Sequence, residues 1–398
     1  MITRRLIWAL GSSQLVCWGI SYYLIAVFGE AIAAETGWSL TVVYGGFSAA
    51  IVVMGLVSPV VGRVIDRHGG RPVMVTGSVL IALGCTALAL ARSLPAYYAA
   101  WLCLGLAMRM SLYDAAFATL ARLGGRAARR PISQITLLGG LASTALWPIG
   151  QTLNAAYGWR IALLVYAGLA LATVPLHLLI PAGRSDDQAV GAPVSAQEIA
   201  PLARTEDDRR FAGALYAAGL MLTTFLASAM SAHQIALLTG LGLATASAVW
   251  VSTLRGVGQS AARLCEILFG RRLDPLTLGV MATALLPIGF GAGYWAGGSL
   301  AAALAFSLLY GAGNGLGTIV RGTQPLVLFD PAVYGSLVGR LAAPSFYVAA
   351  AAPITFAWTI ERFGEPAALT LAVAVGILAL ACAATLRWRF RERRPVIS

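Results

Sequence analysis

Two arginines stand inside long apolar runs, where a charge is unfavourable. Arg109 and Arg255 lie well away from the short polar gaps that hold most other charged residues. A charge at the centre of a bilayer costs about 2.5–3.5 kcal/mol on insertion scales. A guanidinium can hold a carboxylate or phosphate through two parallel hydrogen bonds. We therefore interpret both as candidate contacts for an anionic or strongly polar ligand. The alternative is structural, with Arg109 paired to Asp114 or to backbone carbonyls.

Two further residues are candidates for carrying protons. Asp114 is the one acid deep within an apolar run, and intramembrane carboxylates often serve in proton relays. His233 ends another run, and histidine changes charge near physiological pH. The alternatives are a permanent arginine partner for Asp114 and a capped helix end for His233.

Aromatic residues accompany these charges. Gln14, Trp18 and Tyr22 recur every four residues, which places them on one face of a helix. Tyr113 follows Arg109 by four residues, so we expect it on the same face as that arginine. Such rings could stack on a ring-bearing substrate, although a stripe of this kind more often only packs. Asn314 is a further polar candidate for substrate contact.

The composition indicates the elements that must position these residues. The 398 residues are 59% hydrophobic and 11% charged, whereas a soluble chain has roughly 25% charged residues. Twelve apolar runs are long enough to span about 30 Å of hydrocarbon as helices. We place them near residues 6–28, 40–61, 73–92, 97–121, 133–156, 159–181, 211–236, 244–268, 276–296, 298–320, 335–360 and 366–386.

The polar gaps predict the domains and the orientation. One long gap separates a six-helix bundle, 1–181, from a second one, 211–398, and we interpret 182–210 as a cytoplasmic linker. With the N-terminus inside, 23 of the 28 arginines fall on the inner side. This asymmetry follows the positive-inside rule and predicts that both termini are cytoplasmic. The same rule accounts for the net charge of +12 without a nucleic-acid partner.

A charged loop after the second run has a counterpart 200 residues later. Residues 62–66 read Gly-Arg-Val-Ile-Asp, and residues 262–266 read Ala-Arg-Leu-Cys-Glu. Gly70-Arg71 likewise matches Gly270-Arg271. The common order of these matches indicates duplication of a six-helix unit.

Gly62, Asp66, Arg67, Gly70 and Arg71 resemble the G-x-x-x-D-R-x-G-R signature of the major facilitator superfamily, with one extra residue before Gly70. The resemblance implies an all-α membrane protein of twelve transmembrane helices in two pseudo-symmetric halves around a central site. It also implies that the loop is a conformational latch. That latch consists of Gly62, Asp66, Arg67 and Arg71, with Arg263 and Glu266 as the counterparts. A plain topology anchor is the alternative.

The resemblance further implies a secondary transporter working by alternating access in a bacterial inner membrane. We expect proton-coupled uptake, or symport, of an organic anion or a polar aromatic metabolite such as a vitamin, in the manner of monocarboxylate-type carriers. Trp147 occupies the position before Pro148 where antiporters often carry glycine, which weakens the exchanger alternative. Efflux of drugs or of metalloids such as arsenite remains open, as does a receptor that kept the fold but lost transport.

The remaining expectations are negative or concern partners. The three histidines show no metal or nucleophile constellation, and no G-x-x-x-x-G-K-[ST] loop occurs, so we expect neither an enzyme nor a cofactor. The expected partners are a small-molecule substrate, protons and the lipid bilayer. We expect a monomer.

Overall fold

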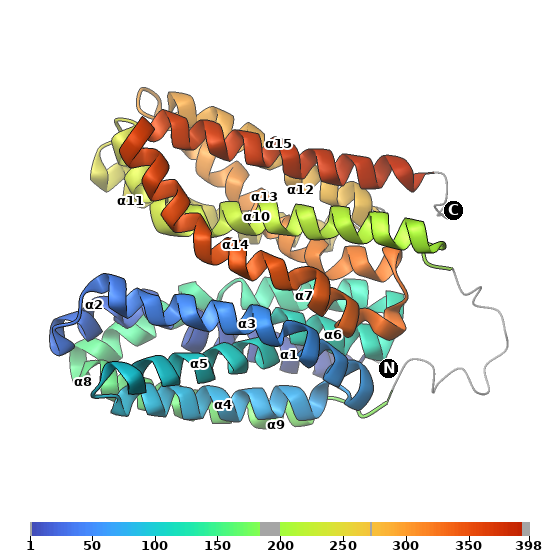
Figure 1. Ribbon diagram of the computed structural model, residues 1–398, viewed down its shortest axis with the longest axis horizontal. Coiled ribbons are helices and arrows are strands. Elements are labelled where there is room, and N and C mark those ends of the chain that lie inside the picture. Colours follow the sequence, from blue (N-terminus) through green and yellow to red (C-terminus); the bar gives the residue numbers. More distant parts are fainter. Residues whose placement is uncertain (1, 184–199, 271–272, 392–398) are drawn as a thin grey trace. The chain divides into compact units, whose positions relative to one another are not determined.

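The computed structural model describes residues 2–183, 200–270 and 273–391, and every regular element in them is helical. Nine helical stretches in this described part are long and apolar enough to cross a membrane. One of them, Leu94–Leu178, has 85 residues and contains three of the predicted spans. With the additional 25-residue helix Thr245–Phe269, these stretches account for all twelve predicted spans. The all-helical prediction is confirmed, and Figure 1 shows the helices in chain order.

The chain separates into two compact units. The first comprises the described residues of 1–195 together with Pro331–Ala343, and the second comprises those of 196–330 and 344–398. The predicted boundaries at 181 and 211 stay a prediction, and residues 184–199 of the predicted linker lie outside the described residues. The end of that linker is already helical, because α10 begins at Glu206 with Thr205 as its N-cap.

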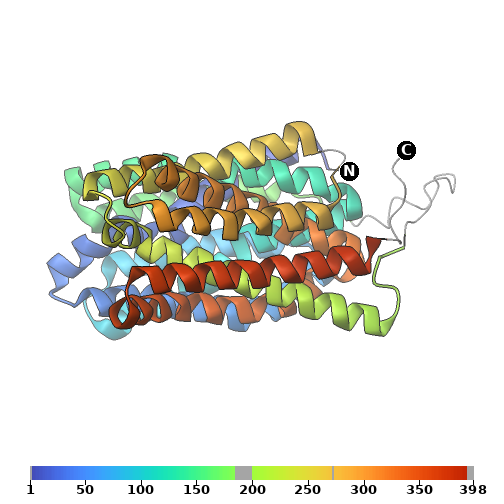
Figure 2. The same cartoon turned by 90° about the horizontal axis from the view of Figure 1, so that it is seen from above.

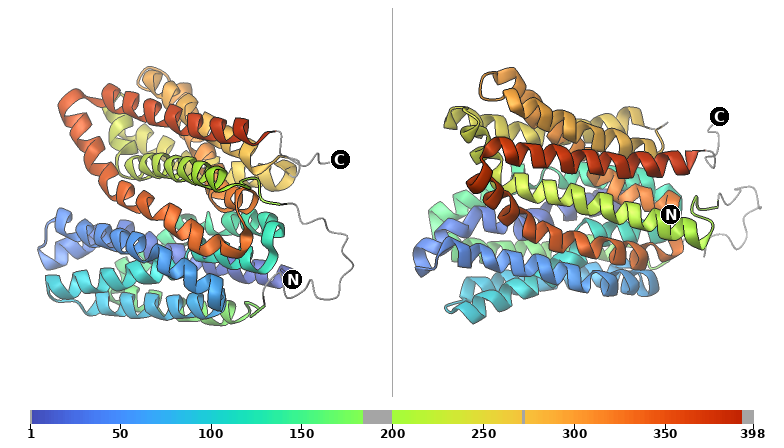
Figure 3. Two further views of the ribbon diagram at one scale, coloured as in Figure 1. Left: turned by 45° about the vertical axis from the view of Figure 1, so that its right-hand side comes forward. Right: turned by 45° about the horizontal axis from the view of Figure 1, so that its top comes forward.

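The first unit is built from nine α-helices and the start of α14. In chain order they are α1 (Arg4–Cys17), α2 (Leu24–Thr36), α3 (Leu40–His68), α4 (Gly70–Leu90), α5 (Leu94–Ser111), α6 (Tyr113–Gly124), α7 (Arg129–Gly139), α8 (Ala142–Ala172) and α9 (Val174–Leu178). Helix α5 packs against α3 and α4, α4 packs against α8, and α1 packs against α7 (Figures 1 and 3).

Three of the predicted spans in this unit are interrupted. A π-helical stretch, Trp18–Tyr22, separates α1 from α2. The predicted helix 97–121 breaks at Leu112, whose extended backbone (φ −83°, ψ −171°) ends α5 and begins α6. Helix α7 ends at Gly139, within the predicted span 133–156. The predicted boundary between 156 and 159 coincides with Gly158, where a positive φ of 79° interrupts α8.

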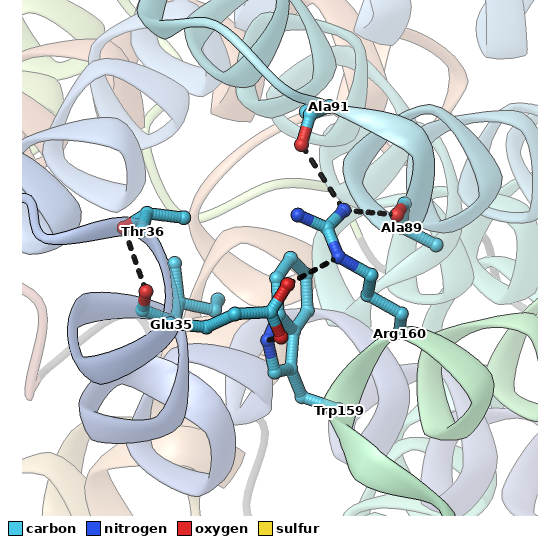
Figure 4. A network of polar contacts seen from close by, with 7 residues as sticks. Glu35, Thr36, Ala89, Ala91, Trp159 and Arg160 are labelled. Atoms are coloured by element: carbon cyan, nitrogen blue, oxygen red, sulfur yellow. Dashed lines mark hydrogen bonds and ion pairs between the residues drawn. The ribbon is translucent and has the colours of Figure 1, made fainter.

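A polar network follows that turn (Figure 4). The Glu35 carboxylate accepts hydrogen bonds from the Trp159 indole at 2.6 Å and from the Arg160 guanidinium at 2.8 Å. Arg160 also donates to the Ala91 carbonyl at 3.1 Å, beyond the end of α4. The network therefore joins the ends of α2 and α4 to the second half of α8 on one side of the unit.

The second unit contains the remaining helices. They are α10 (Glu206–Gly240), α11 (Thr245–Phe269), α12 (Pro275–Ala292), α13 (Leu300–Leu328), α14 (Tyr334–Phe363, from Pro344 onward) and α15 (Glu365–Arg389). Helix α13 packs against α11 and α12, and α15 packs against α10 and α12 (Figures 1 and 2). The core contains the rings of Phe290, Phe306 and Tyr310.

Candidate functional site

Arg109 lies near the C-terminal end of α5 and is buried, with 2% of its surface exposed. Its Nε donates to the Ser58 hydroxyl on α3 at 2.9 Å. Its Nη1 lies 4.0 Å from a carboxylate oxygen of Asp114, whose side chain is 10% exposed. The alternative in which Arg109 pairs with Asp114 therefore has direct geometric support, and the arginine charge is at least partly compensated within the unit.

The break at Leu112 corrects two expectations about this region. Asp114 does not lie deep within a helix, because it is the second residue of α6. A carboxylate in a first helical turn is stabilised by the unpaired amides and the helix dipole. Tyr113 does not share a continuous helix face with Arg109, since the two residues belong to different helices.

Tyr113 nevertheless joins the aromatic residues predicted from the first span. Its ring centroid lies 5.0 Å from that of Trp18, and Trp18 lies 4.9 Å from Tyr22. Phe47 on α3 extends the group with an edge contact to Tyr22 at 5.1 Å. The Tyr113 hydroxyl donates to the Thr136 carbonyl at 3.2 Å. The structure therefore brings Trp18, Tyr22 and Tyr113 together in one aromatic cluster of the first unit.

Arg255 has a different environment in the second unit. It lies on α11, is half-buried, and donates to the side-chain oxygen of Gln234 at 3.4 Å. Gln234 in turn donates from its amide nitrogen to the Ser307 hydroxyl at 2.9 Å. The backbone of α11 at Arg255 touches Gly311 of α13 so closely that a side chain at 311 would clash with the Arg255 carbonyl. The arginine is thus held in a network of neutral groups.

His233 and Asn314 lie in the second unit but are not joined to Arg255 by a hydrogen bond among the described residues. A ring nitrogen of His233 lies 2.9 Å from the Pro353 carbonyl oxygen, within hydrogen-bond distance. Asn314 is half-buried on α13, and its carbonyl accepts a hydrogen bond from Thr318 at 3.0 Å. His233 lies inside α10, which continues to Gly240, so it is not the helix-end residue that the sequence suggested. Its role as a proton carrier stays a prediction.

Asp66 meets the start of another helix. The sequence suggested a loop after residue 61, but α3 continues to His68, so Gly62 and Asp66 lie near the end of that helix. One carboxylate oxygen accepts a hydrogen bond from the Gly335 amide at 2.8 Å, and the other accepts one from the Ser336 amide at 2.6 Å. Both amides belong to the first turn of α14. They would otherwise lack an intrahelical partner, and a carboxylate is the favoured group at such an end. Arg122 donates to the Asp66 backbone carbonyl.

This contact depends on glycine at both surfaces. A Cβ at Gly62 would collide with the Gly335 carbonyl oxygen, and a Cβ at Gly335 would lie 2.5 Å from the Gly62 carbonyl oxygen. Gly62 therefore lets the backbone of α3 touch the backbone at the start of α14. Arg71 at the start of α4 donates to the Ile180 carbonyl at 2.6 Å, whereas Arg67 is exposed.

The counterpart in the second unit is organised differently. Arg263 is 3% exposed and donates to the Gly315 carbonyl at 3.4 Å and to the Thr318 hydroxyl at 3.2 Å, both on α13. Glu266 is buried near the end of α11. Within the described ranges, no group of three or more His, Cys, Asp or Glu side chains is arranged to hold a metal ion.

Three residues of these clusters were not among the predicted site residues. Ser58 is the partner of Arg109, Gln234 is the partner of Arg255, and Phe47 extends the aromatic cluster. Gln234 was open to prediction, because an amide in an apolar run must find a partner. Ser58 and Phe47 carry no comparable signal, since both residue types are common in membrane helices.

Known membrane transporters are similar to this chain in sequence. The chain is 28% identical over 332 residues to human monocarboxylate transporter 11, covering 76% of this chain and 67% of the relative. A shorter match, to the mouse protein of the same name, is 29% identical and covers 44% of this chain and 39% of the relative.

Two solved structures have the same fold. The human organic anion transporter MFSD10 superposes with a TM-score of 0.73 at 17% identity, over 96% of this chain and 99% of the other. The proton:xylose symporter XylE superposes with a TM-score of 0.74 at 15% identity, over 97% and 95%. The sequence pattern of the Major Facilitator Superfamily matches residues 10–258. The chain therefore belongs to the Major Facilitator Superfamily, whose members are membrane transporters rather than enzymes.

Proposed function

We propose that this protein transports a small organic anion by alternating access. The observation that carries the proposal is the environment of Arg255, which is half-buried in a membrane-spanning unit and hydrogen-bonded to the neutral amide of Gln234. A guanidinium held by neutral groups keeps its full charge for a ligand, and it suits a carboxylate in particular. Its polar partners also reduce the desolvation penalty of the empty state.

The names of similar proteins support the same substrate class. The relatives are monocarboxylate transporters, and one protein of the same fold is an organic anion transporter. The aromatic cluster around Trp18 and Tyr113 gives the first unit a surface for a ring or an apolar tail of the substrate. Taken within its own unit, the Arg255 network suits a carboxylate, and the aromatic cluster suits a ring or an apolar group.

The proton gradient is the proposed energy source for uptake, and Asp114 is the proposed proton carrier. Its carboxylate lies 4.0 Å from Arg109, so its protonation would change the charge balance of a buried pair. The name of the proton:xylose symporter, a protein of the same fold, agrees with such coupling. The proposed latch is Asp66 on the start of α14, which would close in one state and open in the other.

The test is uptake by the purified full-length chain in proteoliposomes. Radiolabelled monocarboxylates, aromatic carboxylates and a neutral sugar are offered with and without an inward proton gradient. We expect accumulation of at least one carboxylate, stimulated by the gradient, and none of the sugar. Arg255→Gln should strongly reduce this uptake at low substrate concentration, while Arg362→Gln, which removes an exposed arginine at the end of α14, should keep it.

Other outcomes would contradict the proposal in distinct ways. Accumulation driven only by an outward gradient would indicate efflux. Saturable binding of the carboxylate without any accumulation under either gradient would indicate a receptor. Equal uptake by Arg255→Gln and the parent would remove the assigned anion contact while leaving transport intact.

A further inference from the structure

A pocket of about 780 Å³ opens in the first unit beside the Asp66 contact. Its wall is formed by Pro59, Arg63, Asp66 and Arg67 near the end of α3 and by Ser336 and Arg340 at the start of α14, among others. A volume of this size lies within the usual range for small-ligand sites. The pocket is separate from Arg109 and from the aromatic cluster, neither of which contributes to its wall.

The charge of this pocket is strongly unbalanced. Three arginines line it, and Asp66 is the one acid among the lining residues. Both carboxylate oxygens of Asp66 already accept hydrogen bonds from the Gly335 and Ser336 amides. Arg63, Arg67 and Arg340 are exposed, and none of them forms an ion pair with a described residue. Several guanidinium groups around one cavity form a strong site for a phosphate group.

The surface of α3 beside the pocket indicates where such a phosphate would come from. Pro59, Arg63 and Arg67 form one row along the helix, at intervals of four residues. The neighbouring row is Leu56, Val60 and Val64, which are exposed by 63%, 50% and 37%. An apolar row this exposed suits contact with acyl chains, and the arginines stand beside its end. A single molecule that carries both acyl chains and a phosphate can therefore contact the apolar row and the arginines at the same time.

We propose that this pocket binds the phosphate of an anionic phospholipid, with Arg63, Arg67 and Arg340 as its ligands. The site goes beyond the proposed transport function and requires neither its substrate nor its protons. Arg63 and Arg67 lie on α3, and Arg340 lies on α14. A phosphate held by all three joins the same two helices as the Asp66 contact does. The bound lipid therefore stabilises the state in which Asp66 caps α14.

The test measures ligand binding by the purified full-length chain in a neutral detergent. Dihexanoyl phosphatidylglycerol, dihexanoyl phosphatidylcholine and inorganic phosphate are titrated at constant ionic strength, with thermal unfolding and native mass spectrometry as readouts. Phosphatidylcholine has the same acyl chains without net charge, and inorganic phosphate has the charge without chains. The variants are Arg67→Gln, Arg340→Gln, their double mutant and Arg340→Lys. The matched control is Arg92→Gln/Arg362→Gln, which removes two other exposed arginines.

We expect phosphatidylglycerol to bind more tightly than the other two ligands. Each Arg→Gln change should weaken its binding about 5-fold, because one arginine near anionic lipid contributes about 1 kcal/mol. Arg340→Lys should keep most of the affinity for phosphatidylglycerol. That result would show that the protein tolerates a substitution at position 340. The control should bind as the parent does.

Three results would contradict the proposal. Equal binding by the double mutant and the parent would overturn the site. Equal binding of phosphatidylcholine would show that the charge is irrelevant. Inorganic phosphate binding as tightly as phosphatidylglycerol, through the same arginines, would overturn the lipid as the source. None of these results depends on transport, so the proposed function is judged separately.

Discussion

The two units hold an arginine in the same kind of sequence context but surround it differently. Arg109 is almost fully buried and has a carboxylate, Asp114, at 4.0 Å. Arg255 is half-buried and bonds to the neutral amide of Gln234 at 3.4 Å. One positive charge is therefore compensated inside the unit, and the other is solvated by dipoles. The role of an intramembrane arginine therefore depends on its partners and not on its position in an apolar run.

The matching helix ends, residues 62–66 of α3 and 262–266 of α11, also differ in their partners. Gly62 and Asp66 contact the start of α14, where a side chain at 62 would collide with the Gly335 carbonyl. Ala262, the counterpart of Gly62, packs against an apolar cluster that contains Leu278 and Ile319. Repetition of a sequence pattern has preserved the helix and its charges, whereas the partner of the helix end differs between the units.

The largest expected effect is on stability, from Arg109→Gln. This change leaves the Asp114 carboxylate buried without its cation, which should lower the free energy of unfolding by about 3 kcal/mol. The double mutant Arg109→Gln/Asp114→Asn should recover most of that loss. Unfolding by SDS in mixed micelles measures both. If Arg109→Gln were as stable as the parent, Arg109 would not be needed to balance the charge of Asp114. The proposed difference between the environments of Arg109 and Arg255 would then be wrong.

Arg255→Gln should affect the substrate and leave the fold intact. Loss of one charge-assisted contact to an anion corresponds to about 1.5–3 kcal/mol, or a 10- to 150-fold increase in KM. Arg255→Lys should fall between the parent and Arg255→Gln, because an ammonium lacks the planar fork. Uptake kinetics in proteoliposomes give these values. A fall in stability comparable with that of Arg109→Gln, at unchanged KM, would reverse the two assignments.

Asp66→Asn should loosen the start of α14. The two amides of Gly335 and Ser336 would lose a charged acceptor, which contributes about 1.5 kcal/mol, so their hydrogen exchange should accelerate about 10-fold. Exchange mass spectrometry of peptides covering 331–343 measures this protection. Glu266→Gln is the matched control, because its residue lies in the second unit, and these peptides should not respond to it. Unchanged exchange in Asp66→Asn would show that the contact does not hold the helix end.

The smallest expected effect distinguishes position 62 on α3 from position 262 on α11. Ala262→Gly should lower the free energy of unfolding by only about 0.5–1 kcal/mol, the usual effect of glycine within a helix. The converse change, Gly62→Ala, should also open the start of α14 to hydrogen exchange, because the added methyl meets the Gly335 carbonyl. Thermal unfolding and exchange of the 331–343 peptides test the pair. Equal responses of the two variants would show that positions 62 and 262 are equivalent.

Much of the helical architecture follows from the sequence. The apolar runs predicted the membrane spans, and the boundary between 156 and 159 falls on the turn at Gly158. Trp18 and Tyr22, which were expected on one face of a helix, make a 4.9 Å ring contact within the π-helical stretch. The breaks at Leu112 and in Trp18–Tyr22 were missed, because neither contains a proline and both lie inside apolar runs.

The sequence predicted which residues form the candidate site, but it predicted only some of the contacts between them. Arg109 and Asp114 are five residues apart, so their pairing was open to prediction. Ser58 lies 51 residues from Arg109 in sequence, and Gly335 lies 269 residues from Asp66. Contacts over such separations depend on which helices pack together, and a single sequence contains no signal for that choice.

Hydropathy and charge along the chain were enough to predict a helical membrane protein of duplicated units, with a few charges retained inside its spans. Hydropathy and charge act locally, through the transfer of each residue between water and lipid, so they can be read along the chain. The proximity of Asp114 to Arg109, the hydrogen bond between Arg255 and Gln234 and the capping of α14 by Asp66 became visible only in the folded chain. Those outcomes depend on which side chains packing brings within a few ångströms, because electrostatic and hydrogen-bond energies fall steeply with distance.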